Sequence, residues 1–509
     1  MSAAVAAVAP RFELAGIATC AWCLARRGVN EDGYCELHNS EAKRVRDDKR
    51  RKIMERSARG EAHPQTDIAN GRRFVEQHGD DVRYNADSKR WLAWDGIRWH
   101  DNAVVEVESR AKDTAVSIWD EAKESKNTSL SAWAVRSESS AGVHGMLEMA
   151  HSEASVAITA ALDTDPWLLN TPSGTVNLKT GELRPARRED LITKVTAAPF
   201  DPGAECSRWL QFHDEVCIHA DFTTDRELID YMQRLAGYSL TGSVREQIFA
   251  VFFGQGRNGK TVWLNVIRGL LGDYAVTTAT DLLLSKRDGA PGHALAILHG
   301  RRFVGCAETD AGRRLDESMV KNITGSDKIP ARWLYGQPFE FDPTHKLFLA
   351  TNHRPDIKGT DEAIWRRIHP VPFLRTIDPA KVDSDLEAKL KNEWPGILAW
   401  MVRGCLDWQG LGGLNPPAAV VEAAASYRQE SDAVARFIED CCELLHGAQV
   451  ETSRLVAAYR LWCETEAEQP LSSTAFGREM SNRGCPKDQG RIATISTKLR
   501  RNIRLISES

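Results

Sequence analysis

The stretch Gly254-Gln-Gly-Arg-Asn-Gly-Lys-Thr261 constrains the fold of this chain more than any other feature of its sequence. It matches the pattern G-x-x-x-x-G-K-[ST] at every fixed position. The run IFAVFF before it is typical of a buried strand, and KTVWLNVIRGLLG after it has apolar residues at helical spacing and a glycine stop. The sequence therefore predicts a strand, a glycine-rich loop and a helix in direct succession.

This succession is typical of a nucleotide phosphate site. Backbone N–H groups of such a loop and the N-terminus of the following helix surround phosphate oxygens. We expect Lys260 to reach the β- and γ-phosphates of ATP and Thr261 to hold Mg²⁺. The predicted nucleotide-binding residues are Gly254, Gln255, Gly256, Arg257, Asn258, Gly259, Lys260 and Thr261.

Three later strand-like runs, RRFVGCAE, HKLFLATN and IHPVPF, alternate with helical stretches and predict an α/β fold with a largely parallel sheet. Glu308 and Asp310 both come just after the first run. We expect one of them, with Glu308 our first choice, to position Mg²⁺ or the attacking water. Asn352 ends the second run and is placed to orient water, although asparagine is also a common turn residue. Arg366 and Arg367 precede the third run, either to stabilise transition-state charge in a neighbouring subunit or as a surface pair.

The length of 509 residues indicates three or four domains. We place a disordered tail, zinc-like module and basic helix at 1–60, an α+β accessory domain at 65–204, the ATPase at 205–410 and a further domain at 430–509. No apolar run reaches the roughly 18 residues of a membrane span, so we expect no membrane partner. Eleven mostly scattered cysteines indicate a reducing cytoplasm. The net charge of -5 excludes an overall basic protein, so local clusters must contact any nucleic acid.

The segment CAWCLARRGVNEDGYCELH spaces Cys20, Cys23, Cys35 and His38 as two close pairs separated by a loop. Thiolates and an imidazole in this spacing fit a closed, tetrahedral structural Zn²⁺ site. Chance pairing of surface cysteines is the alternative. Basic residues dominate the helix predicted at 41–60, which is either a solvated helix face or a DNA-touching arm beside the zinc module.

Four segments taken in order resemble the superfamily-three helicases of viruses, phages and plasmids, above all the primase–helicase branch of poxviruses and satellite phages. They are FFGQGRNGKT, RFVGCAETD, MVKNITGSDKIPARWLYGQPFEFDPTHKLFLATNHRP and DEAIWRRIHPVPF. The resemblance is specific over roughly residues 205–400. It is looser over TDIANGRRFVEQHGDDVRYNADSKRWLAWDGIRWH, which is similar to the accessory domain of that branch. It implies a doubly wound, P-loop AAA+-like ATPase with a parallel sheet, assembled as a ring hexamer around DNA.

The resemblance also assigns roles. Lys260 and Thr261 match the first motif, Glu308 the acidic motif and Asn352 the sensor position. Arg366 or Arg367 matches the arginine finger, and we favour Arg367.

The stretch KNITGSDKIPARWLYGQPFEF matches the segment that carries the channel hairpin of the same family. The resemblance then implies that Lys328 and Arg332 contact the backbone phosphates of single-stranded DNA. Trp333 or Tyr335 is placed to stack on bases. Core packing is the alternative for both aromatic residues.

The C-terminal segments SDAVARFIEDCC and LVAAYRLWCE are similar to the winged-helix tail of the same branch. Residues 471–509 fit a helix, a turn and a basic hairpin, the parts with which a winged helix binds duplex DNA. We expect Thr474–Arg483 to be the recognition helix. The candidate phosphate contacts are Arg491, Lys498, Arg500 and Arg501. A protein-docking domain with a solvated basic face is the alternative.

These features predict an ATP-driven DNA helicase in the replication of a phage or mobile element. One alternative is an initiator or regulator that uses ATP only to assemble on DNA, and another is a P-loop protein remodeller. About 60 residues precede the accessory region, which is too few for a primase catalytic domain. We therefore expect no primer synthesis, a separate primase or polymerase as partner, and a location in the host cytoplasm if the protein is viral.

Overall fold

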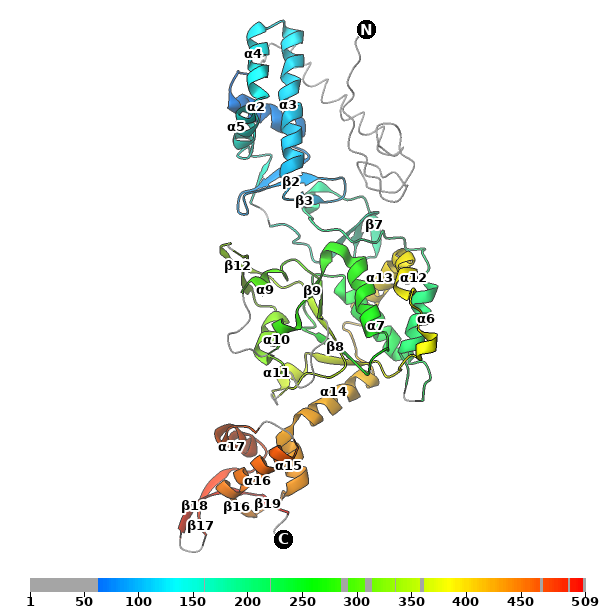
Figure 1. Cartoon of the computed structure of the whole chain (residues 1–509), viewed down its shortest axis with the longest axis vertical. Coiled ribbons are helices and arrows are strands. Elements are labelled where there is room, and N and C mark those ends of the chain that lie inside the picture. Colours follow the sequence, from blue (N-terminus) through cyan, green and yellow to red (C-terminus); the bar gives the residue numbers. More distant parts are fainter. Residues whose placement is uncertain are drawn as a thin grey trace.

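The computed structural model describes residues 63–159, 161–219, 221–284, 292–306, 314–334, 336–357, 361–466, 470–492 and 495–506. Within these residues, the chain forms an N-terminal unit (63–159), a central unit (161–431) and a C-terminal unit (432–506), which follow one another along an elongated molecule (Figure 1). The predicted zinc ligands Cys20, Cys23, Cys35 and His38, and the basic segment 41–60, lie outside the described residues.

The central unit is built on a five-stranded sheet in which every pair of neighbouring strands is parallel. In spatial order, the strands are β14 (Ile368–Pro372), β8 (Phe249–Phe253), β13 (Lys346–Thr351), β10 (Phe303–Cys306) and β9 (Ala275–Thr278). The predicted α/β fold with a parallel sheet is confirmed, and four of the strands fall on the predicted runs. Strand β9 was not predicted.

Helices cover both faces of this sheet, which explains why its strands are continuous apolar runs. Successive residues of β8 enter opposite cores, Ala250 and Phe252 on one face and Phe249 and Val251 on the other. The first core is built with α6 (Ser207–Val216), α7 (Arg226–Ser239), α8 (Lys260–Leu271), α12 (Leu386–Asn392) and α13 (Trp394–Gly410). The second is built with α9 (Gly292–Ala296), α10 (Glu317–Ile323), α11 (Glu362–Trp365) and Tyr427 of α14 (Ala418–Ser431).

The N-terminal unit combines four helices with a small sheet, in keeping with the predicted α+β accessory domain. Its strands are β3 (Trp99–Asp101), β2 (Arg90–Trp94), β1 (Val82–Asn85) and β4 (Ala157–Ile158), in this spatial order. Its helices are α2 (Asp67–His78), α3 (Val104–Ser125), α4 (Thr128–Ser137) and α5 (Ser140–Ala150).

The predicted domain boundary at residue 204 divides a single core. Strands β5 (Leu168–Thr171), β6 (Gly174–Asn177) and β7 (Glu182–Arg184) form an antiparallel sheet that we had placed in the accessory domain. Leu169 and Val176 of this sheet, however, are buried in the same core as Trp209 and Trp263. The boundary escaped prediction because it depends on which core the strands enter, and local sequence does not encode that choice.

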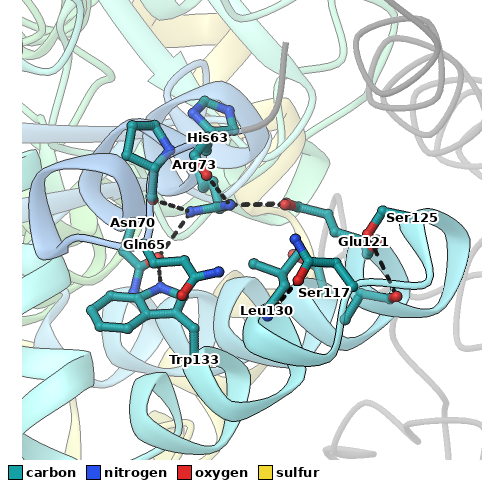
Figure 2. A network of polar contacts seen from close by, with 12 residues as sticks. His63, Gln65, Asn70, Arg73, Ser117, Glu121, Ser125, Leu130 and Trp133 are labelled. Atoms are coloured by element: carbon teal, nitrogen blue, oxygen red, sulfur yellow. Dashed lines mark hydrogen bonds and ion pairs between the residues drawn. The ribbon is translucent and has the colours of Figure 1, made fainter. Parts of the chain in front are cut away.

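A buried arginine organises the helices of the N-terminal unit (Figure 2). Arg73 of α2 is only 1 % exposed and pairs with Glu121 of α3, with an NH2-to-Oε2 distance of 2.9 Å. Its NH1 donates to Asn70 Oδ1 at 3.1 Å, an oxygen that also accepts from the Trp133 indole at 3.1 Å. Its NH2 donates to the carbonyl oxygen of His63 at 3.3 Å. One guanidinium thus joins α2, α3 and the chain segment that enters the unit.

We expect Arg73→Met to lower the local unfolding free energy of this unit by about 3 kcal/mol, because it leaves the mostly buried Glu121 and Asn70 without their partner. Hydrogen exchange of the α2 and α3 amides measures this quantity. The matched control is Arg72→Met, which removes only the exposed Arg72–Glu153 pair and should change exchange by less than about 0.5 kcal/mol. Equal effects of the two variants would contradict the structural role of Arg73.

The C-terminal unit has a core of its own, which includes Phe437, Tyr459 and Phe476. In chain order, its elements are α15 (Ala433–Cys441), β15 (Cys442–Glu443), β16 (Gln449–Glu451), α16 (Thr452–Thr465), α17 (Ser473–Asn482), β17 (Lys487–Ile492), β18 (Ile495–Arg501) and β19 (Arg504–Leu505). Strands β17 and β18 form the predicted hairpin, and β16 pairs with β18 on its other side. Helix α17 lies at the predicted recognition helix.

The eight cysteines of the described part are free thiols, and all but Cys441 are buried. Burial raises the pKa of the Cys306 and Cys405 thiols to about 12, so both remain protonated at neutral pH. Among the described residues, no helix combines the length and apolar character that crossing a membrane requires.

Candidate nucleotide and nucleic-acid site

The glycine-rich loop connects the carboxyl end of β8 to the N-terminus of α8, as predicted. Gly254 and Gly259 have φ angles of 148° and 90°, a region that side chains disfavour. A Cβ at Gly254 would lie 2.2 Å from the carbonyl oxygen of Phe373, and one at Gly259 would lie 2.8 Å from the Phe212 ring. A Cβ at Gly256 would meet no atom within 4 Å. The loop is therefore packed against the protein at its two ends and open at Gly256.

Lys260 and Asn352, 92 residues apart in the chain, meet at this edge of the sheet. Lys260 Nζ donates to Asn352 Oδ1 at 3.1 Å, to Asn258 Oδ1 at 2.9 Å and to the carbonyl oxygen of Gly254 at 2.6 Å. Lys260 is 3 % exposed, whereas Asn352 is exposed just beyond β13. The contact follows from topology, because β8 and β13 are parallel neighbours whose carboxyl ends lie together. It places a buried cation and an exposed amide beside the open loop.

The loop and the start of α8 fit a phosphate group and its metal ion. Gln255, Gly256 and Arg257 are exposed, Asn258 is buried, and Thr261 is exposed in the first turn of α8. Within the described part of the chain, no side chain caps the N-terminus of α8, so its positive end faces outward at this loop. The Thr261 hydroxyl is the kind of oxygen ligand that Mg²⁺ accepts. Glu308 and Asp310, the predicted acidic partners, lie outside the described residues.

The two predicted finger arginines occupy different environments at the amino end of β14. Arg366 is exposed, and its NH2 lies 3.3 Å from Gln247 Oε1. Arg367 is 7 % exposed, and its NH1 and NH2 donate to the carbonyl oxygen of Ala363 at 2.5 Å and to Gln247 Oε1 at 3.0 Å. The preference for Arg367 therefore has no support in the geometry, because its guanidinium is engaged by its own chain. Sequence cannot separate two adjacent arginines that packing buries to different extents.

The segment predicted to carry the channel hairpin forms a two-stranded antiparallel hairpin of β11 (Ile329–Arg332) and β12 (Pro338–Phe341). Lys328 and Arg332 are exposed, and Arg332 Nε donates to the carbonyl oxygen of Gly336 across the turn at 2.8 Å. Trp333 at the tip is 48 % exposed and stacks on Phe339 with ring centroids 5.9 Å apart. It is thus no core residue, which removes the alternative of core packing for Trp333. Tyr335 lies outside the described residues.

The predicted phosphate contacts of the C-terminal unit differ in accessibility. Lys498 and Arg501 are exposed on β18, and Arg501 pairs with Asp488 of β17. Arg500 is 5 % exposed and donates to Ser481 Oγ at 2.6 Å and to the carbonyl oxygen of Cys485 at 3.0 Å. Arg500 therefore fastens α17 to the hairpin, and the expectation that it contacts DNA is not supported. Arg491 lies on β17, and its side chain is outside the described part.

Three segments of the chain match known family models. Residues 71–218 match the family model "D5 N terminal like", residues 429–483 match "Poxvirus D5 protein-like", and residues 252–367 match a family of unknown function, DUF5906. Several viral proteins are similar to parts of this chain. A candidate helicase of Acanthamoeba polyphaga mimivirus is 27% identical over 298 residues, 55% of this chain and 31% of that protein. These matches make the chain similar to the poxvirus D5-like primase–helicase family.

Two further members of this group carry different names. A candidate helicase of Frog virus 3 is 28% identical over 262 residues, 47% of this chain and 26% of that protein. A candidate primase of African swine fever virus is 25% identical over 338 residues, 60% of this chain and 34% of that protein. The chain thus spans about a third or less of the length of these relatives. The predicted resemblance to the primase–helicase branch is confirmed.

A solved structure supports the fold. The apo C-terminal region of NrS-1 superposes with a TM-score of 0.50 at 9% identity and covers 83% of this chain and 95% of its own. At this identity the likeness concerns the fold alone.

Sequence reasoning missed one part of the site. Helix α14 packs against the loop that follows Asn352, and the sequence analysis assigns this helix no role. Arg354, two residues after Asn352, contacts this helix. Its position two residues after Asn352, in the run NHRPD, was the one available signal.

Proposed function

We propose that this protein is an ATP-driven DNA helicase of viral or mobile-element replication, with DNA and further copies of itself as partners. The observation that carries the proposal is the junction of Lys260, the open glycine loop and Asn352 at one sheet edge. A hairpin with an exposed tryptophan belongs to the same unit. The family relatives, which are named as helicases and primases, support the class of activity.

In this proposal, each residue has a defined task. The loop amides and Lys260 bind the phosphates of ATP, and Asn352 orients water toward the γ-phosphate. Thr261 and Glu308 or Asp310 hold Mg²⁺, which neutralises charge on the phosphates when bound. Hydrolysis then changes the position of the loops that Lys260 and Asn352 hold together.

The proposed finger is Arg366, and it acts between subunits. It lies at the amino end of β14, while the glycine loop leaves the carboxyl end of the neighbouring parallel strand β8. The length of β8 therefore separates Arg366 from the loop of its own chain. An exposed arginine in this position serves a nucleotide held by a neighbouring copy, which favours a closed ring, a hexamer by family resemblance.

We further propose that the flanking units contact DNA or partners. The C-terminal order of helix, two short strands, two helices, hairpin and a last short strand contains the parts of a winged helix, with α17 in the major groove and Lys498 and Arg501 near the backbone. Cys20, Cys23, Cys35 and His38 are proposed to bind structural Zn²⁺ on the strength of their spacing. A separate primase or polymerase is a further proposed partner, and the proposed location is the cytoplasm, that of the host if the protein is viral.

The test compares ATP hydrolysis and strand separation with and without single-stranded DNA. We expect Lys328→Ala combined with Trp333→Ala to leave basal hydrolysis within about twofold and to lower DNA stimulation and unwinding at least tenfold, because base stacking contributes about 1–3 kcal/mol per base. Arg332 is left intact, since its bond to Gly336 shapes the turn. Val135→Ala, an exposed apolar side chain on α4, is the control.

The same assay separates the alternatives. Two results together would favour an initiator that uses ATP only to assemble. The first is ATP hydrolysis that DNA does not stimulate, and the second is DNA binding that is unchanged in the hairpin variant. Absence of DNA binding by the wild-type protein would favour a protein remodeller.

A further inference from the structure

The loop that follows Asn352 is held by two hydrogen bonds from other parts of the chain. The hydroxyl group of Tyr427 in α14 donates a hydrogen bond to the carbonyl oxygen of Pro355. On the other side of this loop, Leu315 N donates to the carbonyl oxygen of Asp356 at 3.0 Å. The residues that follow Asn352 are therefore held in place by α14 and by the backbone at Leu315.

Arg354 is the centre of this contact. Its guanidinium carbon lies 4.9 Å from the ring centroid of Phe253 and 4.8 Å from that of Tyr427, and the guanidinium forms an ion pair with Glu430. Phe253 is the last residue of β8, directly before Gly254. One planar cation therefore joins the start of the glycine loop, the loop of Asn352 and α14.

Helix α14 also contacts the element that precedes the proposed finger. Tyr427 meets Trp365 of α11 edge-on, with ring centroids 5.3 Å apart. Arg428 NH1 lies 2.8 Å from Glu362 Oε2 at the start of the same helix. Arg366 follows α11 directly. A displacement of α14 would therefore move residues at both ends of the strands: those near Asn352 at the carboxyl end of β13, and those near Arg366 at the amino end of β14.

The far end of α14 leads straight into the C-terminal unit. Helix α14 ends at Ser431, and the next residue, Asp432, caps α15 by accepting from Ala435 N at 2.9 Å. The other carboxylate oxygen of Asp432 accepts from Arg483, at the end of α17, at 2.6 Å. No loop separates α14 from α15, so the orientation of α14 is passed to the helix proposed to contact DNA. In Figure 1, α14 runs from the central unit to the C-terminal unit.

We propose that Arg354 is a positioning residue that locks the Asn352 loop to α14 and thereby couples the nucleotide site to the C-terminal unit. The coupling rests on the proposed ATPase function, but the contact of Arg354 with Tyr427 and Glu430 of α14 does not. A guanidinium suits the task because its flat surface packs against both rings while its N–H groups bind a carboxylate. Lysine, a compact point charge, cannot make all three contacts at once.

The test uses the full chain with Arg354→Gln, Arg354→Lys and the control Arg245→Gln. Arg245 is matched in chemistry, since it lies 4.1 Å from the Trp408 ring centroid and pairs with Glu246, but it contacts neither Asn352 nor α14. We expect both Arg354 variants to bind a fluorescent ATP analogue within about twofold of wild type. Their kcat for ATP hydrolysis should fall about tenfold, equivalent to roughly 1.4 kcal/mol of transition-state stabilisation. The control should keep wild-type values.

Hydrogen exchange provides a readout that needs no hydrolysis. Without nucleotide, Arg354→Gln should accelerate exchange in residues 353–357 and 421–431 together, and the control should accelerate neither. With the ATP analogue, wild-type protein should show protection in α14 that Arg354→Gln loses.

Two results would overturn the proposal. One is acceleration confined to a single segment, or to none, which would show that Arg354 does not lock the loop to α14. The other is an equal loss of analogue affinity, kcat and thermal stability, which would make Arg354 a merely structural residue. If wild-type protein neither binds nor hydrolyses ATP, the proposed function fails, while the exchange measurement without nucleotide still decides the lock.

Discussion

Lys260→Ala is expected to lower kcat for ATP hydrolysis at least about 100-fold, the effect typical of removing a group that stabilises transition-state charge. Lys260 Nζ is held at the open loop by three oxygens, those of Gly254, Asn258 and Asn352. Alanine has no nitrogen to donate to these oxygens or to a phosphate, and its methyl group stops well short of the open loop.

Steady-state hydrolysis and binding of a fluorescent ATP analogue, measured on the same preparation, check this expectation. Lys389→Ala is the control, because it removes a lysine whose partner is Asp383, away from the loop, with an Nζ-to-Oδ2 distance of 2.8 Å. Hydrolysis within threefold of wild type in Lys260→Ala would mean that ATP is turned over elsewhere.

Gly404→Ala is expected to destabilise the central unit by about 3 kcal/mol, at the upper end of the usual cost of overpacking. Helices α7 and α13 cross so closely that a Cβ at Gly404 would lie 2.2 Å from the carbonyl oxygen of Gln233. A Cβ at Gly237 on the facing helix would lie 2.1 Å from Cys405 N. Because these neighbours are backbone atoms, the helices must separate to admit a methyl group.

Gly410→Ala on the same helix is the matched control, since a Cβ there would meet no atom within 4 Å. That change should leave stability unchanged or raise it by up to about 1 kcal/mol, the helix-propensity gain of alanine over glycine. Thermal unfolding and hydrogen exchange of the α7 and α13 amides distinguish the two variants. Equal stability of Gly404→Ala and Gly410→Ala would contradict the close crossing.

The sequence by itself determined the features that depend on neighbouring residues. The pattern from Gly254 to Thr261 predicted a strand, loop and helix, and β8 and α8 lie there, because glycine positions and apolar spacing act over one or two turns of chain. The runs that became β10, β13 and β14 were predicted for the same reason, whereas the hairpin that carries Trp333 was expected from the family resemblance. The family was recognisable from the order of these motifs.

Only the tertiary structure decided which side chains meet and which remain accessible. The approach of Lys260 to Asn352 depends on strand order, since β13 could have been placed elsewhere in the sheet with the same local sequence. The difference between exposed Arg366 and buried Arg367, and the burial of Arg500, arise from packing against distant residues. So does the contact of Arg354 with Tyr427, 73 positions further along the chain. Burial and side-chain partnership are properties of the whole packed chain, whereas propensity and spacing are local, and that is why the motifs were predictable and their mutual contacts were not.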